Sequence, residues 1–477
     1  MDERGRPETR VAAPGSAADA STTLSAAAMS AQRPALSRTL AARHVGMISV
    51  GGIIGAGLFV GSSAAIAAVG PAIVLSYLIA GTLILLVMRM LAEMAVALPG
   101  ARGFIEFARA GLGPAAGFIV GWLYWYFWVI VVPVEAIAGA ALLQAWIALP
   151  IWLLGLVLVA AMTAVNLMPA RSYGEFEFWF ASIKVAAIVL FIVLAGAYAA
   201  GVLSAGNPGL HNLSGHGGFM PRGPLAVLAG VATVFFSLTG AEITTVAAAE
   251  SRDPARALTR MTTAVILRIL LFYVVAIFLI VTVVPWNRIV PGESPFTHAL
   301  AAMHFSRAGG VMSLVILTAV LSCLNSAFYV TSRVLFTLAE NRDAPGWLVR
   351  LNVRRVPARS VLIGSAAGVA GILAATWSPA GVFAFLINAS GALIVFVYLL
   401  TAGAQIRLRR RCSPGPPSVR VWWFPWSSYA AIAGMLAVLV AMALTRALAS
   451  QLYVSLAALA VVLIAYMLVA RRRRAAP

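Results

Sequence analysis

Charged residues are scarce in this sequence, and long apolar runs take their place. Of its 477 residues only 10% are charged and 62% are apolar, whereas soluble domains average about 25% charged and roughly 45–50% apolar residues. Water could not solvate so many apolar runs in one folded domain. The composition therefore excludes a soluble globular protein and predicts a chain that crosses a membrane many times.

Cysteine and histidine are too few and too scattered to build a disulfide framework or a metal site. The two cysteines are Cys323, in an apolar run, and Cys412, in an arginine-rich loop. The five histidines lie outside the apolar runs, and no His-Glu-x-x-His pair occurs among them. We expect neither a metal nor any other cofactor.

Lysine occurs only once, as Lys184, and every other basic side chain except histidine is arginine. Because Lys184 follows Ile183 and precedes Val185, the Gly-Lys-Ser/Thr of a phosphate-binding loop is absent. The Gly-x-Ser-x-Gly turn of many serine hydrolases is absent as well. These absences exclude an ATP-driven pump, and we expect a protein that is not an enzyme.

Twelve apolar runs are long enough to cross a membrane, because a helix needs about 20 residues to span the hydrocarbon. We expect an all-helical membrane protein with twelve transmembrane helices. The runs are Val45–Ala68, Ala72–Leu98, Ala115–Trp146, Ile151–Met168, Phe176–Leu203, Pro224–Ala248, Met261–Val284, Val311–Leu338, Val361–Trp377, Val382–Ala402, Trp423–Leu444 and Leu452–Ala470.

The arginines indicate on which side of the membrane each end of the chain lies. They fill both tails and every second loop, whereas the remaining loops hold only Arg222, Arg288, Arg307 and Arg446. Basic residues that flank short loops stay on the cytoplasmic side, so we expect both termini in the cytoplasm. The net charge of +19 is thus spread over alternate loops, which speaks against nucleic-acid binding and favours contact with anionic membrane lipids.

Glycine and polar residues interrupt two of the runs. The first run contains Gly51, Gly52, Gly55 and Gly57, and the sixth reads Phe235-Phe-Ser-Leu-Thr-Gly-Ala-Glu-Ile-Thr-Thr. Small residues also allow membrane helices to pack closely, but paired interruptions in corresponding segments of two five-helix halves predict the binding site of an inverted-repeat transporter. Helix N-termini there face an anion and free carbonyls face a cation. This arrangement suits an amino acid zwitterion.

Charged residues inside the runs mark further candidate positions. Lys184 lies in the middle of an apolar run, where inserting an ammonium group costs at least about 2.5–3.5 kcal/mol. The side chain therefore needs a partner or a water-filled cavity, or it has to lose its proton. We expect Lys184 to exchange the transported proton; the alternative is a permanently charged lysine that only holds helices together. Glu93 lies one turn from Arg89 and is expected to be structural. Glu135 is expected to bind the substrate amine or relay a proton, or else to bond between helices, and Glu242 to hold the interruption of the sixth run.

The eighth run also carries polar side chains. We expect Ser322 and Cys323 to be candidates for the cavity. Asn325 is expected to form an ordinary hydrogen bond between helices.

Several segments together resemble the amino acid transporter family of the amino acid-polyamine-organocation (APC) superfamily, over about Arg38 to Arg411. They are Gly52-Ile-Ile-Gly-Ala-Gly-Leu-Phe-Val-Gly-Ser, Gly174-Glu-Phe-Glu-Phe-Trp with Ile183-Lys-Val, Phe236-Ser-Leu-Thr-Gly-Ala-Glu-Ile and Leu324-Asn-Ser-Ala-Phe-Tyr. Within the family the chain is most similar to the bacterial gamma-aminobutyrate (GABA) permeases, through Val131-Val-Pro-Val-Glu-Ala, Gly218-Phe-Met-Pro, Ala247-Ala-Ala-Glu-Ser, Ser322-Cys-Leu-Asn-Ser-Ala and Asn388-Ala-Ser-Gly-Ala.

The resemblance implies a five-plus-five inverted repeat of helices 1 to 10 with helices 1 and 6 broken, followed by two peripheral helices. In this scheme residues 1–40 form a flexible cytoplasmic tail, residues 41–411 the transport core, and residues 412–477 the peripheral helices and a basic tail. It also implies proton-coupled import of a small amino acid, with GABA as the expected substrate, across the inner membrane of a bacterium.

The same resemblance implies roles for individual residues. Backbone amides of Gly55, Ala56 and Gly57 would bind the substrate carboxylate. Phe236, Ser237 and Gly240 would supply carbonyls or space around the amine. The family often has Ser or Thr at the position of Ala56, so capture here would depend on the backbone alone. Lys184 would lie where sodium-dependent relatives hold a cation, near helices 1 and 8.

Two other hypotheses stay open. The same fold could carry another amino acid, whether aromatic, cationic or small and neutral, or could work as an exchanger. A nutrient sensor that binds without transporting belongs to a different class. It would need an output domain, and no loop or tail in this chain is long enough to fold alone.

Overall fold

The structure is a computed structural model. It describes residues 47–48, 52–98, 101, 103–203, 210–248, 270–305, 308–377, 382, 386, 390, 392–411 and 420–475. The expected N-terminal tail, Cys412 and the beginning of the seventh run lie outside these residues. Within them the regular secondary structure is helical, and no strand occurs.

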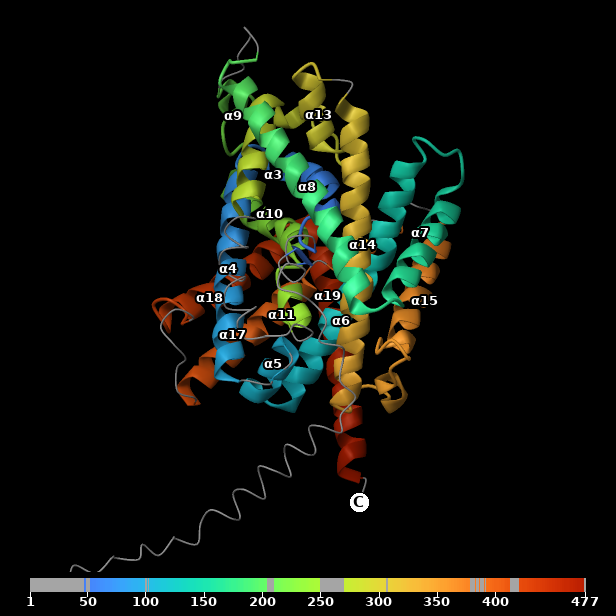
Figure 1. Cartoon of the computed structure of the whole chain (residues 1–477). Coiled ribbons are helices and arrows are strands. Elements are labelled where there is room, and N and C mark those ends of the chain that lie inside the picture. Colours follow the sequence, from blue (N-terminus) through green and yellow to red (C-terminus); the bar gives the residue numbers. More distant parts are fainter. Residues whose placement is uncertain are drawn as a thin grey trace, which may run out of the picture. The chain divides into compact units, whose positions relative to one another are not determined.

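The helices follow the apolar runs along the chain (Figure 1). In order they are η1 (Gly57–Gly61), α3 (Ser62–Val69), α4 (Ile73–Ala97), α5 (Phe104–Leu112), α6 (Pro114–Leu143), α7 (Ile151–Asn166), α8 (Ala170–Ala199), α9 (His211–Ser214), α10 (Gly223–Leu238), α11 (Ile243–Ala248), the helix Leu270–Val283, η2 (Trp286–Arg288), α13 (Pro295–Ala302), α14 (Ala308–Glu340), η3 (Gly346–Val349), α15 (Ala358–Ala374), α17 (Leu393–Arg411), α18 (Trp426–Leu444) and α19 (Arg446–Ala475).

Six of the described helices, α4, α6, α8, α14, α18 and α19, are long and apolar enough to cross a membrane. Shorter apolar helices accompany them at Gly57–Val69, Ile151–Asn166, Gly223–Leu238, Leu270–Val283 and Ala358–Ala374. Hydrocarbon offers no hydrogen bonds, so a membrane segment has to pair its backbone groups internally, and a helix does so. The apolar runs therefore become helices.

Helix α14 is the longest described helix and packs along α6, α7, α8 and α15 (Figure 1). Its middle part is buried on all sides, from Ser322 to Leu335. Two rings stack where α14 meets α8: the centroids of Tyr173 and Tyr329 are 4.2 Å apart. As we expected, Asn325 bonds between helices, accepting from Asn166 Nδ2 of α7 at 2.9 Å. Helix α14 thus joins several layers of the bundle.

The first and sixth runs are both interrupted, at the segments where the sequence places glycine and polar residues. Residues 52–55 form turns and bends before the π-helix η1, and residues 239–242 form a turn between α10 and α11. The two interruptions touch each other. Gly240 has φ +123°, and a Cβ built on it would lie 2.5 Å from the carbonyl oxygen of Gly52. A residue with a side chain therefore does not fit at Gly240.

Glu93, near the end of α4, is held by groups that the sequence could not identify. Its carboxylate accepts hydrogen bonds from Gln405 Nε2 at 3.1 Å, Arg409 Nη1 at 2.9 Å and the backbone N–H of Val421 at 2.6 Å. These donors lie on α17 and in the segment before α18. Glu93 is thus structural, as expected. The sequence indicated Arg89 as its partner, and the structure adds an ion pair with Arg409.

Asp343 ties three further elements together beyond the end of α14. Its side chain is fully buried and forms ion pairs with Arg109 of α5 and, at 2.9 Å, with Arg473 near the end of α19. Its carbonyl accepts from Trp122 Nε1 of α6 at 3.3 Å. The sequence predicted neither α5 nor this contact.

Candidate functional site

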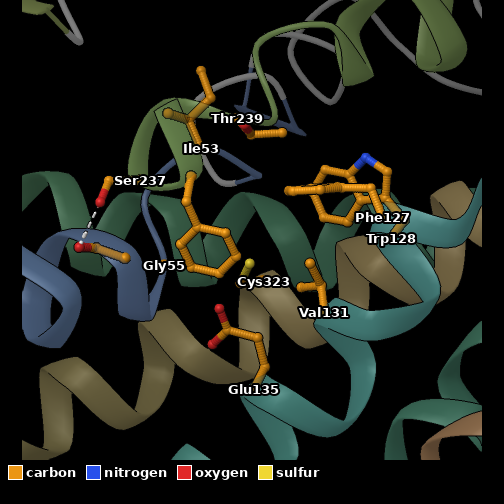
Figure 2. A pocket seen from close by; sticks show the side chains of 11 residues that line it. Ile53, Gly55, Phe127, Trp128, Val131, Glu135, Ser237, Thr239 and Cys323 are labelled. Carbon is orange, nitrogen blue, oxygen red and sulfur yellow. Dashed lines mark hydrogen bonds between the residues drawn. The ribbon is translucent and has the colours of Figure 1, made fainter. Parts of the chain in front are cut away.

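A small cavity lies where the two interruptions face α6 and α14 (Figure 2). The space inside it is about 20 Å³, little more than one water molecule needs. The residues that line it are Ile53, Gly55, Gly57, Phe127, Trp128, Val131, Glu135, Phe236, Ser237, Thr239 and Cys323. The cavity is therefore mostly apolar, with one carboxylate, and it is nearly closed.

Glycine in the first interruption allows close contacts on two sides. A Cβ on Gly55 would lie 2.9 Å from Cβ of Cys323, and one on Gly57 would lie 2.7 Å from Cα of Ser237. Because these neighbours include backbone, a side chain would force the helices apart. The close approach leaves the backbone at the start of η1 as a wall of the cavity. The first amide N–H groups of a helix have no partner within the helix and can bind an anion.

Two hydroxyl groups hold the interruptions against each other. Ser237 Oγ donates to the carbonyl of Gly57 at 2.8 Å, the dashed bond in Figure 2. Tyr273 lies on the helix Leu270–Val283, and its hydroxyl contacts the carbonyls of Ile53 at 2.9 Å and of Ser237 at 3.1 Å. Carbonyls freed by the breaks are thus satisfied by side chains from other segments, as burial requires.

Glu135 is the carboxylate of the cavity. It projects from α6 into the cavity, toward Cys323 (Figure 2). Its carboxylate interacts with the thiol of Cys323 and with the backbone N–H of Ala56. Only 2% of its surface is exposed, and its Oε2 has no hydrogen-bond partner among the described residues. A buried carboxylate oxygen without a partner is unfavourable. Glu135 is therefore placed to receive a proton or the ammonium group of a ligand.

Lys184 lies behind the cavity and does not line it. Its side chain is completely buried in the contact between α8, the first interruption and α14. Its Nζ donates to the carbonyl of Ile54 at 2.7 Å and to Ser322 Oγ at 2.8 Å. The side chain of Lys184 thus bonds directly to the backbone of the broken helix and joins it to α14.

Glu177 is a buried acid near Lys184 that our reading of the sequence missed. It precedes Lys184 on α8 by seven residues, which puts both on one helix face. It is 0% exposed, accepts a hydrogen bond from Ser322 Oγ, and has Asn325 Nδ2 at 3.5 Å from its Oε2. The seven-residue spacing of opposite charges in one apolar run was the signal that could have identified it.

Glu242 closes the turn in the sixth run. Its carboxylate accepts from Tyr124 of α6 at 3.1 Å, from Tyr398 of α17 at 2.8 Å and from the N–H of Gly240 at 3.2 Å. These bonds connect the turn to two long helices. Glu242 therefore holds the interruption, the role that the sequence led us to expect.

The structure brings most of the predicted site residues to one place. The predicted residues that line the cavity are Gly55, Gly57, Glu135, Phe236, Ser237 and Cys323. Those just behind its wall are Ala56, Lys184, Gly240 and Ser322. The rings of Phe127 and Trp128 complete the wall from α6. In the part of the chain that the structure describes, no group of three His, Cys, Asp or Glu side chains could hold a metal ion.

Comparison with known proteins gives one consistent result. Residues 44–476 match the amino acid permease family. The chain is 40% identical over 450 residues to the gamma-aminobutyric acid permease of Bacillus subtilis, covering 93% of this chain and 96% of that protein. It is 48% identical over 403 residues to a probable GABA permease of Pseudomonas aeruginosa, covering 83% and 85%. Its fold is similar to that of a manganese transporter of Eremococcus coleocola, with a TM-score of 0.57 at 13% identity over 90% of this chain and 94% of that one.

Proposed function

The chain belongs to the amino acid permease family, and we propose that it imports a small amino acid, GABA in particular, together with a proton. The observation that carries this proposal is the cavity at the contact of the two interrupted helices, which brings backbone amides together with a carboxylate that has one oxygen without a partner among the described residues. An amino acid zwitterion has one group for each. No covalent step is involved, and alternating access moves the substrate.

The proposed substrate pose follows from the charges around the cavity. The substrate carboxylate binds the amides of Gly55, Ala56 and Gly57 at the start of η1, where the helix dipole is positive. It takes over the Ala56 N–H that bonds to Glu135 in the absence of substrate. The substrate ammonium lies toward Oε2 of Glu135 and the carbonyls of the sixth run, near Phe236, Ser237 and Gly240. Ala56 has no hydroxyl, so the backbone alone holds the carboxylate.

The walls of the cavity favour an unbranched substrate over a large aromatic one. The rings of Phe127, Trp128 and Phe236 already form these walls, and a cavity of about 20 Å³ has to open even for a small substrate. GABA adds only three methylene groups between its charged ends. The two curated relatives named above carry GABA permease in their names, which supports the same choice.

Lys184 is the proposed coupling residue. A buried ammonium is costly at membrane depth, and Lys184 bonds to the broken helix through Ile54. Loss or gain of its proton changes the strength of that bond, so the proton and the helix movement are coupled. In the alternative, Lys184 keeps its charge at all times and only pins the broken helix to α14.

The proposed architecture has twelve membrane helices, with the first ten in a five-plus-five inverted repeat. Its transport core spans residues 41–411, between a cytoplasmic tail of residues 1–40 and peripheral helices in residues 412–477. The protein lies in the inner membrane of a bacterium. Both termini are on the cytoplasmic side, because arginines fill both tails and alternate loops. The same arginines attract anionic lipids.

Uptake of labelled GABA into proteoliposomes tests the proposal. We expect accumulation that requires an inward proton gradient, is lost with a protonophore, and is lost in Lys184→Gln although this variant still binds GABA. Arg288→Gln is the control, because it removes one positive charge at an exposed position and should transport normally.

Each other outcome rejects a defined part of the proposal. Uptake of a different amino acid from a competition panel rejects GABA as the substrate. Uptake that depends on internal amino acid and not on the proton gradient identifies an exchanger. Binding without any uptake identifies a sensor, and gradient-driven uptake by Lys184→Gln rejects Lys184 as the coupling residue.

A further inference from the structure

The buried carboxylate of Glu177 has no part in the substrate site. It does not line the cavity, and it is 0% exposed, although carboxylates are almost never fully buried unless paired. The groups that interact with it are Lys184 on its own helix and the uncharged side chains of Ser322 and Asn325 on α14. The position of Glu177 behind Lys184 therefore calls for a role in the chemistry of that lysine.

Ser322 connects Lys184 to Glu177 in one direction. Lys184 Nζ donates to Ser322 Oγ at 2.8 Å, and the hydroxyl of Ser322 donates in turn to Oε1 of Glu177. A hydroxyl has one hydrogen to donate and lone pairs to accept another. The two hydrogen bonds therefore point the same way, from the lysine through the hydroxyl to the carboxylate. A proton can move along them from Lys184 to Glu177.

We propose that Glu177 accepts the transported proton from Lys184 through Ser322 and releases it on the cytoplasmic side. The inference rests on the proton coupling proposed above, and it adds the route by which the proton leaves. Glu177 then acts after substrate binding, which explains why it lies outside the cavity.

The transfer is balanced without any further reactant. One N–H bond of Lys184 breaks as an O–H bond forms on Ser322, while the original O–H bond of Ser322 breaks as one forms on Glu177 Oε1. Lys184 becomes a neutral amine, Glu177 becomes a neutral carboxylic acid, and Ser322 is unchanged. Because low-polarity surroundings disfavour ions, exchanging two buried charges for two neutral groups adds no charge to the membrane interior.

The direction of the route follows from α8. The backbone of Glu177 lies seven residues before that of Lys184 on α8, which is about 10 Å along the helix axis at 1.5 Å per residue. Glu177 is therefore nearer to the first residue of α8, Ala170. That end is cytoplasmic in the proposed orientation, since Arg171, in the first turn of α8, belongs to the segment before the fifth run that this orientation places in the cytoplasm. Glu135 lines the cavity and Glu177 does not, and Lys184 interacts with both carboxylates. Lys184 thus connects the substrate site to the carboxylate nearer the cytoplasmic end of α8.

A purely structural ion pair between Glu177 and Lys184 makes a different prediction. Such a pair would support every mode of transport equally, because all modes need the folded protein. A proton-release residue is needed only when the carrier returns empty. During exchange of external for internal substrate, the carrier returns loaded and its proton need not leave. Net uptake and exchange therefore separate the two roles.

The experiment compares these two assays in proteoliposomes that contain Glu177→Gln. We expect gradient-driven accumulation of labelled GABA to fall about 100-fold or more, the lower end of what a proton-transfer group contributes, with exchange against internal GABA unchanged. Ser322→Ala should behave in the same way, and Ser322→Thr, which keeps the hydroxyl, should restore accumulation. Glu293→Gln, at an exposed carboxylate, is the matched control and should transport normally in both assays.

The outcomes distinguish this inference from the function on which it rests. If the parent protein accumulates no GABA in response to a proton gradient, both proposals fail. If the parent is coupled and Glu177→Gln accumulates GABA equally well, only the route through Glu177 is overturned. Equal loss of accumulation and exchange in Glu177→Gln and Ser322→Ala, without rescue by Ser322→Thr, would also overturn it and leave a structural pair.

Discussion

Replacing Gly240 by alanine should damage the protein more than any other single added methyl group near the site. Gly240 has φ +123°, and the new Cβ would lie 2.5 Å from the carbonyl oxygen and 2.8 Å from the carbonyl carbon of Gly52. Both atoms belong to the backbone of the other interrupted helix, so no side-chain rotation relieves the overlap. The two interruptions would have to separate.

The expected cost combines two terms. A residue with a side chain in such a backbone conformation costs about 1–3 kcal/mol, and an overpacked contact costs about 1–3 kcal/mol more. Together they give about 2–6 kcal/mol, and even the lower end is roughly a 30-fold change in an equilibrium constant. Gly240→Ala should therefore lower the unfolding temperature and reduce substrate binding.

Thermal unfolding of the purified protein in detergent, with and without substrate, measures both effects. Gly196→Ala is the matched control, because Gly196 lies within α8 with no atom within 4 Å of the added Cβ. It should stabilise the protein by about 0.5–1 kcal/mol, as alanine does in a helix interior. If Gly240→Ala unfolds and binds like the parent, the two interruptions do not touch as described.

Two hydrogen-bond variants test the contacts around the interruptions. Ser237→Ala removes the donor to the Gly57 carbonyl, which should cost about 0.5–1.5 kcal/mol and weaken substrate binding several-fold in a radioligand assay; unchanged affinity would show that the bond does not shape the site. Tyr398→Phe keeps the ring but removes a donor from the buried Glu242. Its cost of about 1–3 kcal/mol should appear as a lower unfolding temperature, and a temperature equal to that of the parent would contradict the holding role of Glu242.

The sequence predicted the interruptions well because their cause is local. Glycine lacks a Cβ and weakens a helix, and although small residues also serve close helix packing, their occurrence with polar residues in two corresponding runs favoured the breaks. The buried position of Lys184 was equally accessible, since a single ammonium in the middle of such a run has to find partners. In each case the physical requirement depends on the residue itself.

Contacts that depend on the orientation of a helix were harder to predict. Helix α6 is apolar around its whole circumference, so its sequence does not indicate that Phe127 and Trp128 face the cavity. Glu177 was missed for a related reason, because its importance depends on Ser322, which lies 145 positions away. The ion pair of Glu93 with Arg409 spans 316 positions. Such partners are defined by packing and not by the local pattern.

The contact between the two interruptions joins residues that the ribosome adds to the chain at very different times. Ser237 and Gly57 are 180 positions apart, and at about 5–20 residues per second roughly 9–36 seconds separate their synthesis. During that interval the first helix exists without the segment that covers its break, and free backbone groups in lipid are unfavourable. The growing chain therefore has to keep this backbone satisfied, either in a continuous helix or within the insertion machinery. The two interruptions can meet only after the sixth helix has been made, and the cavity is completed only once α14 has supplied Cys323.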